Sequence, residues 1–210
     1  MKKPFVLVVL FILPLVAYLF FASGVNNFGR LPVLTEKVPE PNNFEGDNSL
    51  ADKITILGFL GSNIEDRKGN AFNLNQKIYK RFSEFKDFQF LMIVPKGNEA
   101  ATASLKEELG ALSEVDKWNF AFGNESEIQT FFKSLKTNVE LGPDLSTPYV
   151  FIIDKDRNLR GRNDDEDEGV KYGFNTTSVA ELNNKMEDDV KIILAEYRLA
   201  LKKNNADRSK

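Results

Sequence analysis

The sequence contains no cysteine and no histidine among its 210 residues. Without a thiolate the chain cannot exchange disulfides, and neither a disulfide framework nor a cysteine-type zinc site can form. Without an imidazole there is no base for a serine hydrolase of the triad kind. Soft copper ions prefer Cys, Met and His ligands, and three scattered methionines do not make such a site. These absences favour a protein that works by binding.

An excess of positive charge and glycine-rich loops are also lacking. Lys and Arg number 28 against 31 Asp and Glu, so the net charge of −3 gives no basic field to recruit nucleic acid. No phosphate-binding glycine loop or dinucleotide fingerprint is present. Apolar residues are abundant at 42%, with 18 phenylalanines, which suffices for one packed domain. We expect a domain that binds no nucleic acid and has no cofactor.

The N-terminus carries a targeting signal. Lys2 and Lys3 precede an apolar run over residues 4–21, which approaches the roughly 20 residues of a membrane span. Positive charge before the run favours a cytoplasmic N-terminus. We predict a signal anchor over residues 1–24, a single pass through the inner (cytoplasmic) membrane, with the C-terminal domain on the periplasmic or extracytoplasmic side. A cleavable signal peptide ending near Ala22 is the alternative, and it also exports the domain.

Three regions are expected after the anchor. Residues 25–51 contain three prolines and show no periodicity, which predicts a linker or a segment that wraps along the domain. A domain is expected over 52–204, and a disordered tail over 205–210.

Apolar runs and helical spacing predict the elements of the domain. Strands are expected at 54–61, 88–95, 118–122, 149–154 and 158–162, the last as an antiparallel edge, and helices at 70–86, 100–112, 124–136 and 178–203. A capping box of Ser178 and Glu181 begins the last helix. This order predicts an α/β fold of the thioredoxin-like type, with a central mixed sheet and helices on both faces.

Four segments of the domain resemble a known family. KITILGFLGSNIEDRKGN, FQFLMIVPKGNE, WNFAFGNESEI and STPYVFIIDKDRNLRGR are similar to the SCO/SenC branch of the thioredoxin superfamily. The likeness covers residues 52–203 and rests on strand order and patterning rather than on an invariant motif. It implies a membrane-anchored, exported protein related to the copper chaperones that help to assemble cytochrome c oxidase.

The ligands of that family are absent from this chain. The resemblance puts the two metal-binding cysteines within Ser62–Arg67, where no residue can act as a thiolate. The copper-binding histidine of an Asp-His-Ser pattern corresponds to Leu145, between Asp144 and Ser146. Copper delivery therefore does not carry over, and we predict no catalytic residue and no metal ligand.

Thr147 and Pro148 match the cis-proline position of thioredoxin-like proteins, so the resemblance implies a cis bond there. It also implies a groove that recognises a partner polypeptide between this position and the loop after the first strand. A trans proline that starts a strand and a vestigial loop are the alternatives. The candidate groove consists of Gly61, Ser62, Asn63, Ile64, Glu65, Asp66, Thr147 and Pro148.

An acidic run precedes the last helix. Its members are Asp164, Asp165, Glu166, Asp167 and Glu168. Such runs are usually solvated surface. Weak binding of a hard cation, or contact with a basic patch of a partner, are the alternatives.

Three functions from different classes follow. The leading hypothesis is a membrane-tethered, exported thioredoxin-like binding or assembly factor without redox or copper ligands. The resemblance implies respiratory oxidase biogenesis as its setting, and its protein partner is unidentified. The alternatives are an enzyme with cysteine-independent carboxylate chemistry and a structural cell-envelope protein that interacts through the acidic run or the last helix.

Overall fold

The computed structural model describes residues 10–16, 18 and 29–208. Residues 10–16 are helical, and most of the expected anchor over 1–24 lies outside the described residues. Within those ranges, no helix is both long and apolar enough to cross a membrane.

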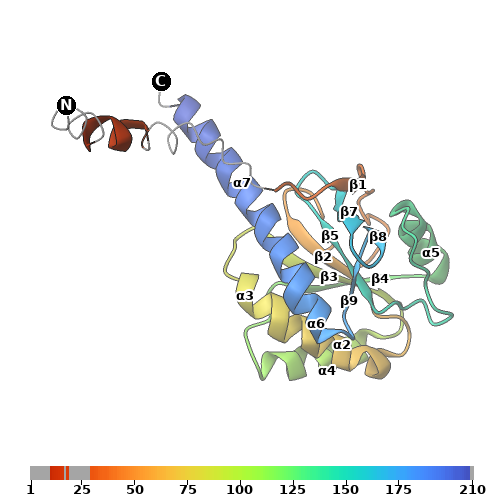
Figure 1. Cartoon of the computed structure of the whole chain (residues 1–210). Coiled ribbons are helices and arrows are strands. Elements are labelled where there is room, and N and C mark those ends of the chain that lie inside the picture. The colour runs from red at the N-terminus through yellow and green to blue at the C-terminus, as the bar shows by residue number, and fades with distance from the viewer. Residues whose placement is uncertain (1–9, 17, 19–28, 209–210) are drawn as a thin grey trace, which may run out of the picture.

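A mixed sheet forms the centre of the domain (Figure 1). The strand order is β1-β6-β5-β2-β3-β4, and β9 pairs with β5. β2 runs parallel to β3 and β3 parallel to β4, whereas β5 is antiparallel to β2. Nearly every residue of β2 and β3 is buried, as expected for parallel strands covered on both faces. The bounds are β1 Val33–Thr35, β2 Ile54–Phe59, β3 Phe88–Pro95, β4 Trp118–Gly123, β5 Tyr149–Ile153, β6 Leu159–Arg160 and β9 Phe174–Asn175.

Helices cover both faces of the sheet, as predicted (Figure 1). On one face lie helix α4 and two long helical segments, each with a π-helical turn. The two segments are α2-η1-α3 and α6-η2-α7. On the other face α5 packs with the N-terminal segment. The bounds are α2 Ile64–Leu74, η1 Asn75–Tyr79, α3 Lys80–Phe82, α4 Glu99–Gly110, α5 Glu125–Ser134, α6 Val179–Glu181, η2 Leu182–Met186 and α7 Glu187–Arg208.

Aromatic side chains fill both layers of the core. Trp118 and Phe90 lie with ring centroids 4.7 Å apart on the α2 face. Phe59 and Phe132 meet edge to face at 5.0 Å on the α5 face. Such geometries add to the apolar area that each ring buries. The abundance of phenylalanine therefore reflects two packed layers on one sheet.

The segment expected as a linker belongs to the folded unit. Val38 and Leu50 are fully buried, and Leu31 is nearly so. β1 pairs antiparallel with β6, and the Val38 amide donates to the Arg157 carbonyl at 2.7 Å. A few apolar residues without periodicity are therefore sufficient to hold this segment against the domain. Residues 29–51 are thus a segment that wraps along the domain, which was the alternative to a linker.

Several boundaries differ from those predicted. The first helix begins at Ile64 rather than at residue 70, because Ile64 is buried against the sheet. The strand expected at 158–162 is not an edge: its first part, β6, lies between β5 and β1. α7 continues through Arg208, past the domain end expected at 204.

The predicted capping box of the last helix forms only in part. Ser178 Oγ accepts from the Glu181 amide at 3.2 Å. The Glu181 carboxylate does not bond back to the cap; it accepts from the Asn175 amide and pairs with Lys171. A complete capping box is found instead at the start of α5, between Asn124 and Glu127.

Candidate functional site

The loop after β2 lies directly against the segment before β5. Leu60 bridges to Ser146, and the Thr147 amide donates to the Phe59 carbonyl at 3.2 Å. The Ser62 amide donates to the Asp144 carbonyl at 2.9 Å. The two segments singled out from the sequence are therefore joined by backbone hydrogen bonds.

The eight candidate groove residues differ in exposure. Gly61, Ile64 and Thr147 are buried, Pro148 is half-buried, and Ser62, Asn63, Glu65 and Asp66 are exposed. The exposed members start α2, where Asn63 Nδ2 donates to Asp66 at 2.6 Å. A recognition role for this set stays a prediction.

The bond between Thr147 and Pro148 is trans, so the expected cis-proline is wrong. The chain turns before β5 at Leu145 instead, which adopts a left-handed backbone conformation with φ 64°. Pro148 then continues in the direction of the strand, and its carbonyl accepts from the amide and hydroxyl of Thr176. A trans bond needs no tertiary support, unlike the cis isomer.

A polar cluster lies beneath this contact. Arg67 donates to Ser146 Oγ through Nε at 3.0 Å and through Nη2 at 2.8 Å. The same hydroxyl lies 2.8 Å from both carboxylate oxygens of Asp144 and donates to them. Ser146 thus links an opposite pair of charges and holds α2 onto the segment before β5. No pattern in the sequence predicts the contact of Arg67 with Ser146.

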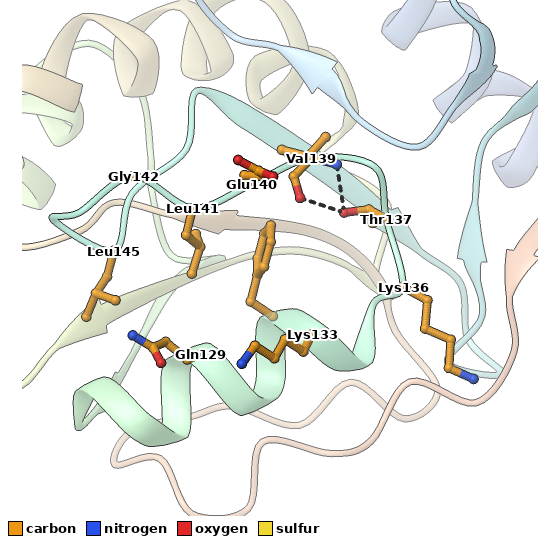
Figure 2. A pocket seen from close by; sticks show the side chains of 10 residues that line it. Gln129, Lys133, Lys136, Thr137, Val139, Glu140, Leu141, Gly142 and Leu145 are labelled. Atoms are coloured by element: carbon orange, nitrogen blue, oxygen red, sulfur yellow. Dashed lines mark hydrogen bonds between the residues drawn. The ribbon is translucent and has the colours of Figure 1, made fainter.

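A cavity of about 390 Å³ opens beside Leu145, between α5 and the loop over residues 136–145 (Figure 2). Its lining is Gln129, Phe132, Lys133, Lys136, Thr137, Val139, Glu140, Leu141, Gly142 and Leu145. The residue that replaces the expected metal ligand is therefore part of an apolar wall. The sequence did not reveal the cavity, because the loop has no periodic pattern.

The loop has left-handed, non-glycine residues at both ends: Lys136 at φ 52° and Leu145 at φ 64°. Such a conformation costs a non-glycine residue roughly 1–2 kcal/mol and persists where neighbouring contacts hold it. Thr137 Oγ1 hydrogen bonds with the amide and carbonyl of Val139 (Figure 2). The Gly142 amide donates to the Ser146 carbonyl at 2.7 Å. The cavity wall is therefore a defined structure.

The acidic run is part of a β-hairpin. β7 (Arg162–Asp165) pairs with β8 (Gly169–Lys171), and the Asp165 side chain is only 1% exposed. Lys185 Nζ lies 2.8 Å from Asp165 and 2.7 Å from Asp167, and Glu168 pairs with the buried Lys171. Solvated surface is thus wrong for Asp165, because its basic partners come from the same chain. The other four members, Asp164, Glu166, Asp167 and Glu168, are exposed, as expected for solvated surface.

The hairpin makes stability depend on pH. Burial acts to raise the pKa of Asp165, but the Lys185 ammonium and the amides of Asp167 and Glu168 outweigh it, and the pKa is lowered. A carboxyl with a lowered pKa stabilises the fold above its unfolded pKa, and this stabilisation disappears as the pH falls. We expect Asp165→Asn to cost about 1–3 kcal/mol near neutral pH. The deficit should shrink between about pH 5 and pH 2.

Urea unfolding of both proteins across that range measures the deficit. Asp164→Asn, at an exposed position in the same hairpin, is the matched control and should differ little from the parent. A deficit for Asp165→Asn that stays constant with pH would contradict the assignment.

No protein-family model matches the chain, and no curated protein is significantly similar to it. Solved structures with the same fold are found. BsSco, a member of the Sco family of cytochrome c oxidase assembly proteins, superposes with a TM-score of 0.51 at 17% identity, covering 78% of this chain and 97% of its own. A SCO1/SenC family lipoprotein from Bacillus anthracis str. Ames gives 0.50 at 16% identity, over 76% and 95%.

These comparisons show the fold. The chain has a mixed α/β thioredoxin-like fold of the kind found in Sco/SenC proteins, as the sequence patterning predicted. It has that fold without any cysteine or histidine.

Proposed function

We propose that this protein is a membrane-tethered, exported member of the envelope's assembly machinery that acts by binding another protein. Respiratory oxidase biogenesis is the setting, and no thiol or copper ligand takes part. A Sco-like fold supports the setting, and the apolar run after Lys2 and Lys3 supports the tether. The domain then lies on the periplasmic or extracytoplasmic side of the cytoplasmic membrane.

One observation carries the proposal. At the position that the resemblance assigns to a copper-binding histidine, Leu145 lines a cavity of about 390 Å³. Its neighbour Ser146 binds both Asp144 and Arg67 through its hydroxyl, so this hydroxyl is not open to a ligand. The surface suited to coordination is replaced by a surface suited to apolar contact.

An enzyme with carboxylate chemistry is less well supported. Paired catalytic carboxylates must face one another across a cleft. The lining of this cavity includes one carboxylate, Glu140. Asp144 accepts from Ser146, and Asp66 accepts from Asn63, so these two carboxylates already have partners.

A structural role through the last helix is also less well supported. That idea needs an exposed apolar face on α7. Val190 and Ile193 are fully buried against the sheet, and Leu194 is 9% exposed. The apolar face of this part of α7 is therefore used within the domain.

Crosslinking in native membranes tests the proposed function. A tagged full-length protein is treated with a mild lysine-reactive crosslinker, purified, and its captured partners are identified. We expect oxidase subunits or their assembly factors to be enriched over a tag-only control. Capture of nothing above that control would contradict the proposal.

A further inference from the structure

We propose that the cavity beside Leu145 is the partner's docking site, and that it takes an apolar side chain with an acidic residue next to it in the partner's sequence. This inference rests on the proposed function and adds the chemistry of what is recognised.

The cavity has an apolar interior. Phe132 projects from α5, and Val139, Leu141 and Leu145 come from the facing loop. Figure 2 shows Leu141 and Leu145 pointing from the loop toward the helix. All three loop residues are only half-buried, although they pack against the core. An apolar side chain that enters the cavity removes this surface from water, which is favourable.

The cavity is also formed in advance. Its volume of about 390 Å³ lies within the range of ligand pockets, about 300–1,000 Å³. The Thr35 hydroxyl donates to the Leu135 carbonyl at 2.7 Å and fixes the end of α5. The Leu145 amide donates to Gly142 at 3.0 Å and fixes the loop. Because the loop and the end of α5 are already ordered, binding of the partner costs little conformational entropy in this protein.

The charged residues at the rim of the cavity favour an acidic residue beside the partner's apolar residue. Lys133 and Lys136 are exposed, and neither forms an ion pair in the part of the chain that the structure describes. Figure 2 shows Lys133 on the helix side of the apolar side chains and Glu140 on the loop side. When the partner's carboxylate lies on the α5 side of its apolar residue, that carboxylate can pair with Lys133. Complementary charge of this kind sets orientation and partner choice.

Site-specific photocrosslinking tests the assignment in native membranes. The full-length protein carries p-benzoylphenylalanine at position 141, on the cavity wall, or at position 112 as the control. Leu112 is 48% exposed and lies just after α4, on the opposite face of the sheet. We expect position 141 to crosslink a partner peptide that has an apolar residue and an Asp or Glu within two positions. Position 112 should not give this peptide.

A charge reversal adds a second readout. In the position-141 protein, Lys133→Glu should lower the yield of that crosslink by about tenfold, because like charges then face each other. Lys80→Glu is the matched control: Lys80 is also exposed, but it lies on α3, so this variant should leave the yield unchanged. Reversing the partner's acidic residue to lysine should restore the yield with Lys133→Glu.

Four results would overturn the inference: no crosslink at position 141, equal crosslinks at 112, a lipid in place of a peptide, or no loss with Lys133→Glu. The lysine-reactive crosslinking experiment distinguishes a wrong docking site from a wrong assembly role. If it still captures oxidase subunits, the assembly role stands and only the docking site is wrong.

Discussion

Replacing Gly61 with alanine is expected to destabilise the protein by about 3 kcal/mol or more. Gly61 has φ 71°, where a Cβ is strained in any surroundings. Here the Cβ would also lie 2.6 Å from the Asp144 carbonyl oxygen and from Ser146 Cβ. Both neighbours belong to the segment that pairs with the loop after β2, so neither can move without opening that contact.

Gly169→Ala separates the clash from the backbone strain. Gly169 has the same φ of 71°, but nothing lies within 4 Å of its added Cβ. We expect that variant to cost about 1–2 kcal/mol, the price of the left-handed backbone alone. Denaturant unfolding compares the two variants with the parent. Equal losses would mean that the contact between Gly61 and Ser146 does not hold the site together.

Replacing Arg160 with methionine is expected to cost about 3–5 kcal/mol, because it leaves a buried carboxylate without its cation. Arg160 is 4% exposed and donates to Asp154 at 2.9 Å, to Glu196 at 2.7 Å and to the Leu31 carbonyl at 2.8 Å. Burial acts against its charge, but the bonds to Asp154 and Glu196 hold the pKa of Arg160 above its ordinary value. One side chain therefore ties β6 to the N-terminal segment and to α7.

Lys191→Met is the matched control, since it also removes a cation from an ion pair. Lys191 is half-exposed and pairs with Asp188 and Glu187 on its own helix. Asp188 is exposed, and the buried carboxylate of Glu187 keeps Arg81 as a second cation. Exposed helical pairs contribute about 0.3–0.5 kcal/mol, so little loss is expected. Thermal unfolding and limited proteolysis near residue 31 measure both effects. A loss for Arg160→Met as small as that for Lys191→Met would show that the buried network is not what holds the segment.

The sequence was most informative where burial is continuous. The apolar runs that became β2 and β3 are readable because both faces of these strands are covered. The helical spacing of Ile128, Phe131 and Phe132 likewise predicted α5. The order of such elements was enough to predict a thioredoxin-like sheet with helices on both faces.

The candidate site was harder to predict because its shape depends on the backbone and on distant partners. A left-handed Leu145 has no sequence signal, since glycine is the residue expected at positive φ. The cis-proline was inferred from resemblance and not from any local feature. Asp165 resembled solvated charge because Lys185, its partner, lies 20 residues away in the sequence. The contact of Arg67 with Ser146 spans 79 residues.

A titration with Cu(I) tests whether this Sco-like fold acts without copper chemistry, as we propose. The purified full-length protein competes for the metal with a chromophoric Cu(I) chelator, and Leu145→His serves as a comparison. We expect no stoichiometric transfer of copper to the natural chain, because Leu145 and the loop at Ser62–Arg67 offer no soft ligand. Stoichiometric binding with sub-micromolar affinity would contradict a role without copper.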